Sequence, residues 1–487
     1  MALPLLLCGP ILRRVEPTLA SVWVALREPA TVAIRLWEGR VASGAGNMLL
    51  SSEPAGTRTL RVGAQLHIAL ATIKIPKTSP RLLQPGRAYS YDLAITIGNT
   101  THTLKTLGLL TKGQVFGKAM EPLGFEENML PSFALPPERI EDLRVLFGSC
   151  RRPWTDFPDA MVWIDDLMRE NPAYSFTDPL KRPHQLFLGG DQIYADDVSP
   201  VHLRMLIDLS RALIGESAGA AVERLMVDNV RRKKANVTPT GFDDYDGNVT
   251  RETGAPADFS LPADHAHFPA GRRFLMTTVD AQMTTVDAWS HLFSLGEFAA
   301  MYLTVWSDAC WSRKTGTTTP ALDLPTADQL MTESPPWPDR IPTFLDAPLG
   351  GKEARDHALS KAEREVSPFQ NYGAYLEPRA DDDRTPEKRQ ADYAKHRADL
   401  KEELERHRKQ LTLLESGLGK VRRALANIPT YMIFDDHDVT DDWNLNPMWY
   451  DRVYTTSLGV TTLRNALVSY ALFQDWGNDP LKYEKGN

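Results

Sequence analysis

The sequence predicts a multidomain α+β protein, in which an all-β sandwich precedes an α/β domain built on a parallel sheet with helical insertions. Three observations predict this arrangement. Short β-prone runs separated by Pro and Gly fill residues 1–112. A strand–helix–strand pattern begins at residue 143, which is typical of a parallel sheet. A long heptad pattern covers residues 386–427.

The N-terminal region reads as a sandwich of the fibronectin-III or immunoglobulin type. The runs 21–26 and 31–37 are apolar or alternating, and Glu28-Pro29 separates them. The turn at 83–91 resembles the one before a late strand in fibronectin-III-like modules. No cluster of catalytic residue types occurs here, so we expect a packing or substrate-presenting domain.

Residues 113–140 contain Gly and Pro and lack periodicity, which predicts a linker. The α/β domain is expected at 141–487. Its strands would end at Cys150, Asp191 and Asp435, each after an apolar run. Because ligands of open α/β sheets lie beyond the carboxyl ends of the strands, we expect these three residues near one site.

Two helical segments are predicted within the α/β domain. Residues 198–235 are expected to form a helical insertion of two helices. In the second segment, 386–427, apolar residues at alternating steps of four and three form a seam on a charged helix. Its members are Leu400, Leu404, His407, Leu411, Leu414, Leu418, Val421 and Leu425. The seam must pack on a partner, which is either another part of this chain or a second copy.

Composition limits the classes of function. The formal net charge is −8, whereas a protein that binds nucleic-acid phosphates normally has a basic excess, so no nucleic-acid partner is expected. Three widely separated cysteines indicate reduced thiols. No basic segment precedes the apolar N-terminus, and no apolar run approaches ~18 residues. We therefore expect no signal peptide, no membrane contact and a cytoplasmic location.

The segment 433–443 concentrates chemistry at one strand end. It carries five carboxylates and His437, and so much negative charge repels itself unless cations hold it together. Asp191 follows two glycines, which leave room for a metal or phosphate to approach, and its two oxygens can bridge two cations. Arg151 or Arg152 could hold a non-bridging phosphate oxygen or form a surface salt bridge.

Three motifs together resemble the PhoD-like alkaline phosphatases of the calcineurin-like metallophosphoesterase superfamily. The motifs are Ser149-Cys150, Gly190-Asp191-Gln192-Ile193-Tyr194, and Asp435-Asp436-His437-Asp438 with Trp443. The resemblance implies a metallophosphatase sheet domain. It also implies hydrolysis of phosphate mono- or diesters by a metal-activated hydroxide, with iron(III) and calcium as the metal pair.

The resemblance also implies roles for individual residues. Asp191 would bridge the metals, and Tyr194 and Cys150 would bind iron(III). Asp436 would face the second ion, while His437 would contact the phosphate and assist the leaving oxygen. Of Asp435 and Asp438, one would orient His437 and the other would bind a metal. We therefore assign Cys150, Asp191, Tyr194, Asp435 and Asp436 to metal binding, and His437, Asp438 and Arg151 to catalysis.

The sequence departs from the family at its C-terminal end. The superfamily closes its metal site with late histidines, but no histidine follows His437 here. We therefore expect a C-terminally incomplete domain, an incomplete metal site and an open sheet edge. The alternative function is a degenerate metallophosphatase that acts as a binding or assembly module, with self-association through residues 386–427. A calcium-binding adhesion protein is disfavoured because the carboxylates lie outside the sandwich.

Overall fold

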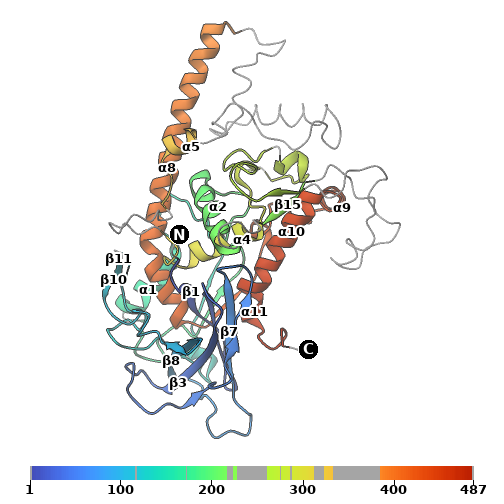
Figure 1. Ribbon diagram of the computed structural model, residues 1–487. Coiled ribbons are helices and arrows are strands. Elements are labelled where there is room, and N and C mark those ends of the chain that lie inside the picture. The colour runs from blue at the N-terminus through green and yellow to red at the C-terminus, as the bar shows by residue number, and fades with distance from the viewer. Residues whose placement is uncertain are drawn as a thin grey trace.

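The computed structural model describes the greater part of the chain, namely residues 3–115, 118–171, 173–215, 223–227, 260–274, 276–285, 288–311, 323–332 and 384–484. An antiparallel β region at the N-terminus is followed by a mixed α/β region with several helices (Figure 1).

Two antiparallel sheets form the N-terminal β region. One sheet has the order β1-β2-β7-β6. Its strands are β1 (Leu6–Glu16), β2 (Leu19–Leu26), β7 (His67–Lys74) and β6 (Leu60–Arg61). The other has the order β12-β8-β3-β4, with β5 beside β3 and β9 beside β8. Its strands are β12 (Ser132–Ala134), β8 (Ala88–Ile97), β3 (Thr31–Glu38), β4 (Leu50–Ser51), β5 (Thr57–Arg58) and β9 (Thr100–His102).

The segment 113–140, which was predicted to be a linker, is partly built into this β region. It contains the hairpin β10 (Gly113–Val115) and β11 (Lys118–Met120), and then β12, which pairs with β8. Phe133 of β12 is fully buried in the same apolar core as the strands of both sheets. The linker prediction is wrong at β12, because burial of one aromatic side chain and pairing with β8 stabilise a strand too short to show a period.

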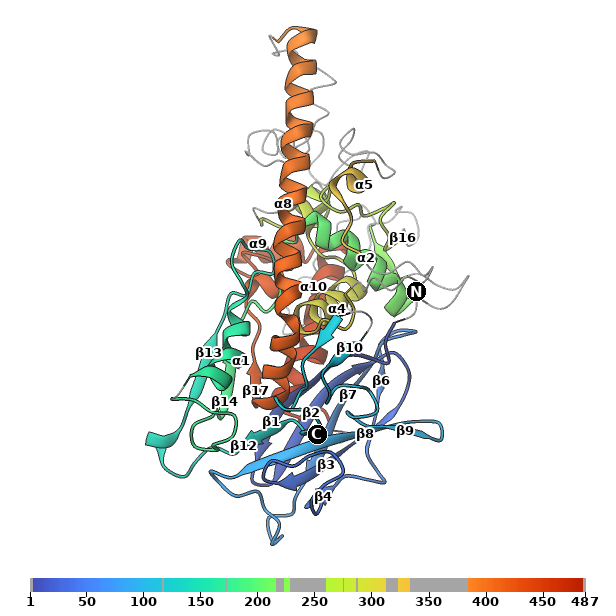
Figure 2. The same cartoon turned by 90° about the vertical axis from the view of Figure 1, so that its left-hand side faces the viewer.

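A three-stranded parallel sheet forms the centre of the α/β region. Its order is β13-β14-β17, with β13 (Val145–Gly148), β14 (Gln185–Leu188) and β17 (Thr430–Met432). All three strands run in the same direction, so their carboxyl ends meet at one edge (Figure 2). The loops after these strands carry Cys150, Asp191 and Asp435.

One face of this sheet is exposed. Phe147 is 74% exposed and Phe187 is 37% exposed, and Phe187 stacks on Tyr431 at 5.3 Å between ring centroids. The other face, which includes Leu186 and Leu188, is buried. At the free edge of β17, the side chain of Asn478 accepts a hydrogen bond from the backbone of Met432 and donates one to it, so an amide side chain replaces a neighbouring strand there.

The helix expected at 386–427 is α8 (Pro386–Asn427), which runs alongside the α/β region and extends away from the sheets (Figures 1 and 2). All eight seam residues are buried. The lower half of α8 packs on α1 (Ala160–Glu170), α2 (Pro200–Ile214) and β1 of the same chain. Arg423 forms a two-pronged ion pair with Asp165 of α1, with both N–O distances 2.6 Å. Self-association through 386–427 stays a prediction.

The segment 198–235 is only partly helical. Helix α2 occupies its first half, but residues 224–226 form strand β15 (Arg224–Met226), and 216–222 and 228–235 lie outside the described residues. The prediction of a second helix is wrong at β15, because this strand pairs with β16 (Ser260–Pro262) and buries Leu225. Tertiary pairing here overrides local propensity.

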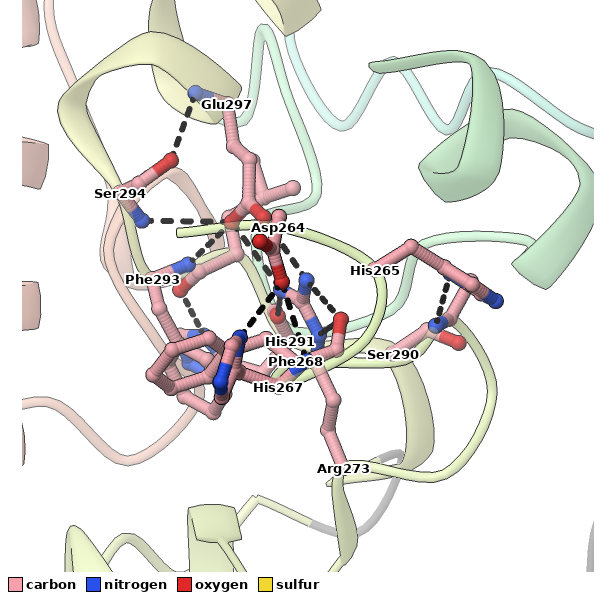
Figure 3. Close-up of polar contacts among 12 residues, drawn as sticks. Asp264, His265, His267, Phe268, Arg273, Ser290, His291, Phe293, Ser294 and Glu297 are labelled. Carbon is pink, nitrogen blue, oxygen red and sulfur yellow. Dashed lines mark hydrogen bonds and ion pairs between the residues drawn. The ribbon is translucent and has the colours of Figure 1, made fainter. Parts of the chain in front are cut away.

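Five further helices are described after β16. They are α4 (Leu295–Trp306), α5 (Ala327–Thr332), α9 (Pro447–Val453), α10 (Ser457–Tyr470) and α11 (Trp476–Asn478). Of these, α5 packs on α8, α10 on α4 and α11 on the sheets. The N-terminus of α4 is fixed by a capping box of Ser294 and Glu297, and Glu297 also forms a fully buried two-pronged pair with Arg273 (Figure 3). This pair holds α4 against the loops that surround the sheet ends.

The N-terminal β region and the C-terminal helices are tied together by buried polar contacts. Arg13 of β1 is fully buried and donates to the carbonyl oxygen of Gln474 and to the side chain of Asn478. The indole N–H of Trp23 donates to the carbonyl oxygen of Leu472. None of the helices in the described part of the chain combines the length and apolarity needed to cross a bilayer.

Candidate metal centre

Strained backbone positions mark the loops that follow β13 and β14. Cys150 and Asp191 both adopt positive φ, at 56° and 49°, a region that L-residues with side chains avoid. Gly190 has φ of 119°, and a Cβ there would lie 2.5 Å from the Cβ of Asp435. The loops after β14 and β17 therefore touch only because residue 190 has no side chain. Such strain persists where the surrounding structure holds it, and it clusters at functional sites.

Three carboxylates meet at this point. Single oxygens of Asp191, Asp435 and Asp436 lie within 4.8 Å of one another, and this is the metal-compatible cluster of the described residues. Asp191 is 3% exposed, and its Oδ1 is buried with no hydrogen-bond partner among those residues. Burial raises the pKa of Asp191, and the nearby carboxylates raise it further. An orphaned buried oxygen beside two more carboxylates fits a hard cation, which prefers oxygen ligands.

Cys150 and Tyr194 lie beside this cluster. The Cys150 side chain is within hydrogen-bonding reach of both the Asp191 carboxylate and the Tyr194 hydroxyl. Burial raises the pKa of Tyr194, and the charge of Asp191 adds to the effect. Without a cation the phenol therefore stays protonated at neutral pH. The cluster of ligand atoms within 4.8 Å in the described residues holds the three carboxylates without the Cys150 sulfur, so metal binding by Cys150 and Tyr194 stays a prediction.

His437 is oriented by a carboxylate that the sequence did not single out. Its Nδ1 lies 3.0 Å from Oδ1 of Asp196, and its ring stacks on Tyr194 with centroids 4.5 Å apart. This hydrogen bond raises the pKa of His437 to about 9, against the opposing effect of burial. Nδ1 therefore carries the proton that Asp196 accepts, and Nε2 remains for a second contact.

Asp196 is itself held from several sides. It is 1% exposed and accepts hydrogen bonds from the Thr285 hydroxyl at 2.9 Å and from the Asp441 backbone N–H at 2.8 Å. Burial opposes its ionisation, but the hydrogen bond and charge of His437 hold its pKa below the ordinary value. The pair is therefore an imidazolium beside a carboxylate at neutral pH.

Asp438, which was predicted to be catalytic, is buried and does not face the cluster opening. It is 1% exposed, and its oxygens accept from the backbone N–H groups of Gln192, Ile193 and Asp435 at 3.1 Å each. Burial raises its pKa to about 7. The side chain ties the loop after β17 to the loop after β14, and the catalytic role of Asp438 stays a prediction.

The Arg151 side chain forms an ion pair outside the carboxylate cluster. It pairs with Asp159 with an Nε–Oδ2 distance of 2.9 Å, and both side chains are less than one-tenth exposed. Arg152 forms an ion pair with Asp197 at 2.6 Å and lies over the ring of Trp154 at 3.8 Å. Neither guanidinium contacts the carboxylate cluster, so the role proposed for Arg151 in holding a phosphate oxygen finds no support in these contacts.

Two residues that contact the site without having been singled out from the sequence are Asp196 and Thr285. Asp196 lies in the motif that carries Asp191, but nothing in linear spacing connects it to His437, which is 241 residues away. Thr285 belongs to a duplicated segment without a family signature. Contacts between residues far apart in the chain leave no spacing or motif in the sequence from which they could be predicted.

Comparisons with known proteins give limited matches. The model of a domain of unknown function, DUF7800, matches residues 3–96, which lie within the N-terminal β region. A solved structure titled "Structure of PhoD" aligns with 96% of this chain at a TM-score of 0.31 and 8% identity. The chain spans less than half of that structure's length, 46%. A search of the curated proteins finds no match.

Proposed function

We propose that the chain hydrolyses phosphate esters, mono- or diesters, at the centre formed by Asp191, Asp435 and Asp436. The observation that carries the proposal is the orphaned, buried Oδ1 of Asp191 beside two further carboxylates. Three negative groups within 4.8 Å destabilise one another without a counter-charge. A cation that draws them together also creates positive charge at the mouth of the site, where a phosphate can bind.

The residues around the centre would bind the cations. Asp191, Asp435 and Asp436 would hold the cations, with Cys150 and Tyr194 as further donors. When bound, such cations would neutralise the negative charge of the ester and lower the pKa of coordinated water. The resemblance of the motifs suggests iron(III) and calcium for this role.

His437 supplies the acid. Its Nδ1 proton is held by Asp196, and its pKa of about 9 keeps the ring cationic at neutral pH. An imidazolium beside a phosphate can hydrogen-bond a non-bridging oxygen and can protonate a departing alkoxide from Nε2. Tyr194 packs flat on the ring and fixes its plane.

The direct test is hydrolysis of bis(4-nitrophenyl) phosphate by the full chain. We expect turnover that is lost in chelator and restored by Mn²⁺, Fe³⁺ or Ca²⁺. We expect Asp191→Asn to lose at least 100-fold in kcat, on the order of the effect of removing one electrostatic stabiliser. Asp142→Asn, in the short helical turn before β13 and therefore at the amino end of that strand, is the control. Turnover that Asp191→Asn leaves unchanged refutes the proposal.

A further inference from the structure

A cavity of about 480 Å³ opens beside the candidate metal centre. It lies between the buried face of β13 and β14 and one side of α1. Its apolar walls are Leu146, Leu186 and Leu188 from the strands, and Trp163, Ile164 and Leu167 from the helix. We call it the β13–α1 cavity. Its volume lies in the range of small-molecule sites, which are about 300–1,000 Å³.

The β13–α1 cavity borders the loops after β13 and β14, which carry Cys150 and Asp191. Ser149, Cys150 and Gln192 line it, and Cys150 also contacts Asp191. Gln192 follows Asp191 directly in the chain, so the cavity adjoins the loop that carries the central carboxylate.

Two buried polar atoms of the lining lack partners. Gln192 is 1% exposed, and its Oε1 has no hydrogen bond within the described residues; the same holds for Nη1 of Arg151. Gln192 and Arg151 both line the cavity. Buried polar groups are normally satisfied, so an acceptor and a donor left open at the inner end of an apolar cavity point to a ligand with matching polar atoms.

The two aromatic side chains at the outer end support an apolar occupant. Phe157 is 77% exposed and Trp163 is 63% exposed, and both line the cavity. Arg151 does not fill the space, because Asp159 holds its side chain against the wall. The lining therefore combines open polar atoms of Gln192 and Arg151 with exposed aromatic side chains.

We propose that the β13–α1 cavity binds the apolar alcohol portion of the phosphoester, so that the substrates are esters of long-chain or aryl alcohols with a polar atom near the phosphate. This inference rests on the proposed function for the position of the phosphate. Arg151 then donates to an oxygen of the alcohol portion, and Gln192 accepts from a hydroxyl or amide group there.

The test measures binding and turnover separately. Binding of octyl phosphate and methyl phosphate to the full chain is measured by calorimetry. Hydrolysis of octyl and methyl 4-nitrophenyl phosphate is measured by absorbance. We expect octyl phosphate to bind at least about tenfold more tightly than methyl phosphate, which corresponds to burial of about two methylene groups.

Cavity-filling variants test whether the preference for octyl phosphate arises in the β13–α1 cavity. Leu167→Trp fills the cavity from α1, on the side away from the ion pair that joins α1 to α8, and Ile164→Phe is a second variant if the first does not fold. Glu170→Trp adds the same ring at an exposed position of the same helix and is the control. We expect Leu167→Trp to abolish the octyl preference and Glu170→Trp to retain it.

The outcomes separate the two proposals. Equal affinity for both phosphates, or an octyl preference that survives both filling variants, overturns the cavity inference. An octyl preference in binding with no hydrolysis of either diester overturns the proposed function and supports the cavity. Hydrolysis of both diesters with equal kcat/KM supports the function and overturns the cavity.

Discussion

The ion pair between Arg423 and Asp165 gives the sharpest prediction about stability. Both side chains are fully buried, and two N–O distances of 2.6 Å join them. Arg423→Met leaves the Asp165 carboxylate buried without its partner, and an unpaired buried charge costs about 3–5 kcal/mol. We expect the free energy of unfolding to fall by that amount, measured by urea denaturation followed by circular dichroism.

Two comparisons test the physical cause. The double variant Arg423→Met with Asp165→Leu removes both charges, so we expect it to recover most of the loss. Arg35→Ala breaks the exposed pair with Glu53 and should cost less than about 1 kcal/mol. A loss below about 1 kcal/mol for Arg423→Met, or no recovery in the double variant, refutes the view that this pair fixes α8 on α1.

Three further predictions concern the loops around the site. Gly190→Ala adds a Cβ that would lie 2.5 Å from the Cβ of Asp435. We therefore expect the free energy of unfolding, measured by thermal denaturation, to fall by at least about 2 kcal/mol. An unchanged Tm contradicts the close approach of the two loops. Asp196→Asn should lower the pKa of His437 from about 9 towards its ordinary value, seen by NMR titration, and an unchanged pKa contradicts the pairing. Burial raises the pKa of Glu223 to about 7, above its ordinary value of 4.5. Its contribution to stability is therefore present below pH 4.5 and lost as pH rises through about 7. Glu223→Gln should remove a decline on the order of 3 kcal/mol, and a decline that persists in this variant contradicts the assignment.

The sequence predicted the parallel sheet because its strands have clear signals. Apolar runs that stop at Cys150, Asp191 and Asp435 mark three strand ends, and the rule that parallel strands share an edge brings these residues together. The heptad pattern predicted α8 for the same reason, since a period sustained from Leu400 to Leu425 needs no tertiary information.

The sequence could not predict what depends on contacts between distant loops. Asp436 and Asp438 differ in position by only two residues, yet Asp436 is only partly buried whereas Asp438 is fully buried under three backbone N–H groups. The short helical turn after β17 decides which carboxylate faces the cluster, and no residue pattern records that turn. Strand β12 escaped prediction similarly, because three residues are too few to show a period.

The most direct test of the account is to locate a cation in crystals of the full chain soaked in Mn²⁺, using anomalous scattering. We predict a peak within about 2.0–2.6 Å of oxygens of Asp191, Asp435 and Asp436, and no peak there in Asp191→Asn. A peak elsewhere on the chain with these three carboxylates bare would contradict the metal centre and the hydrolysis proposed from it.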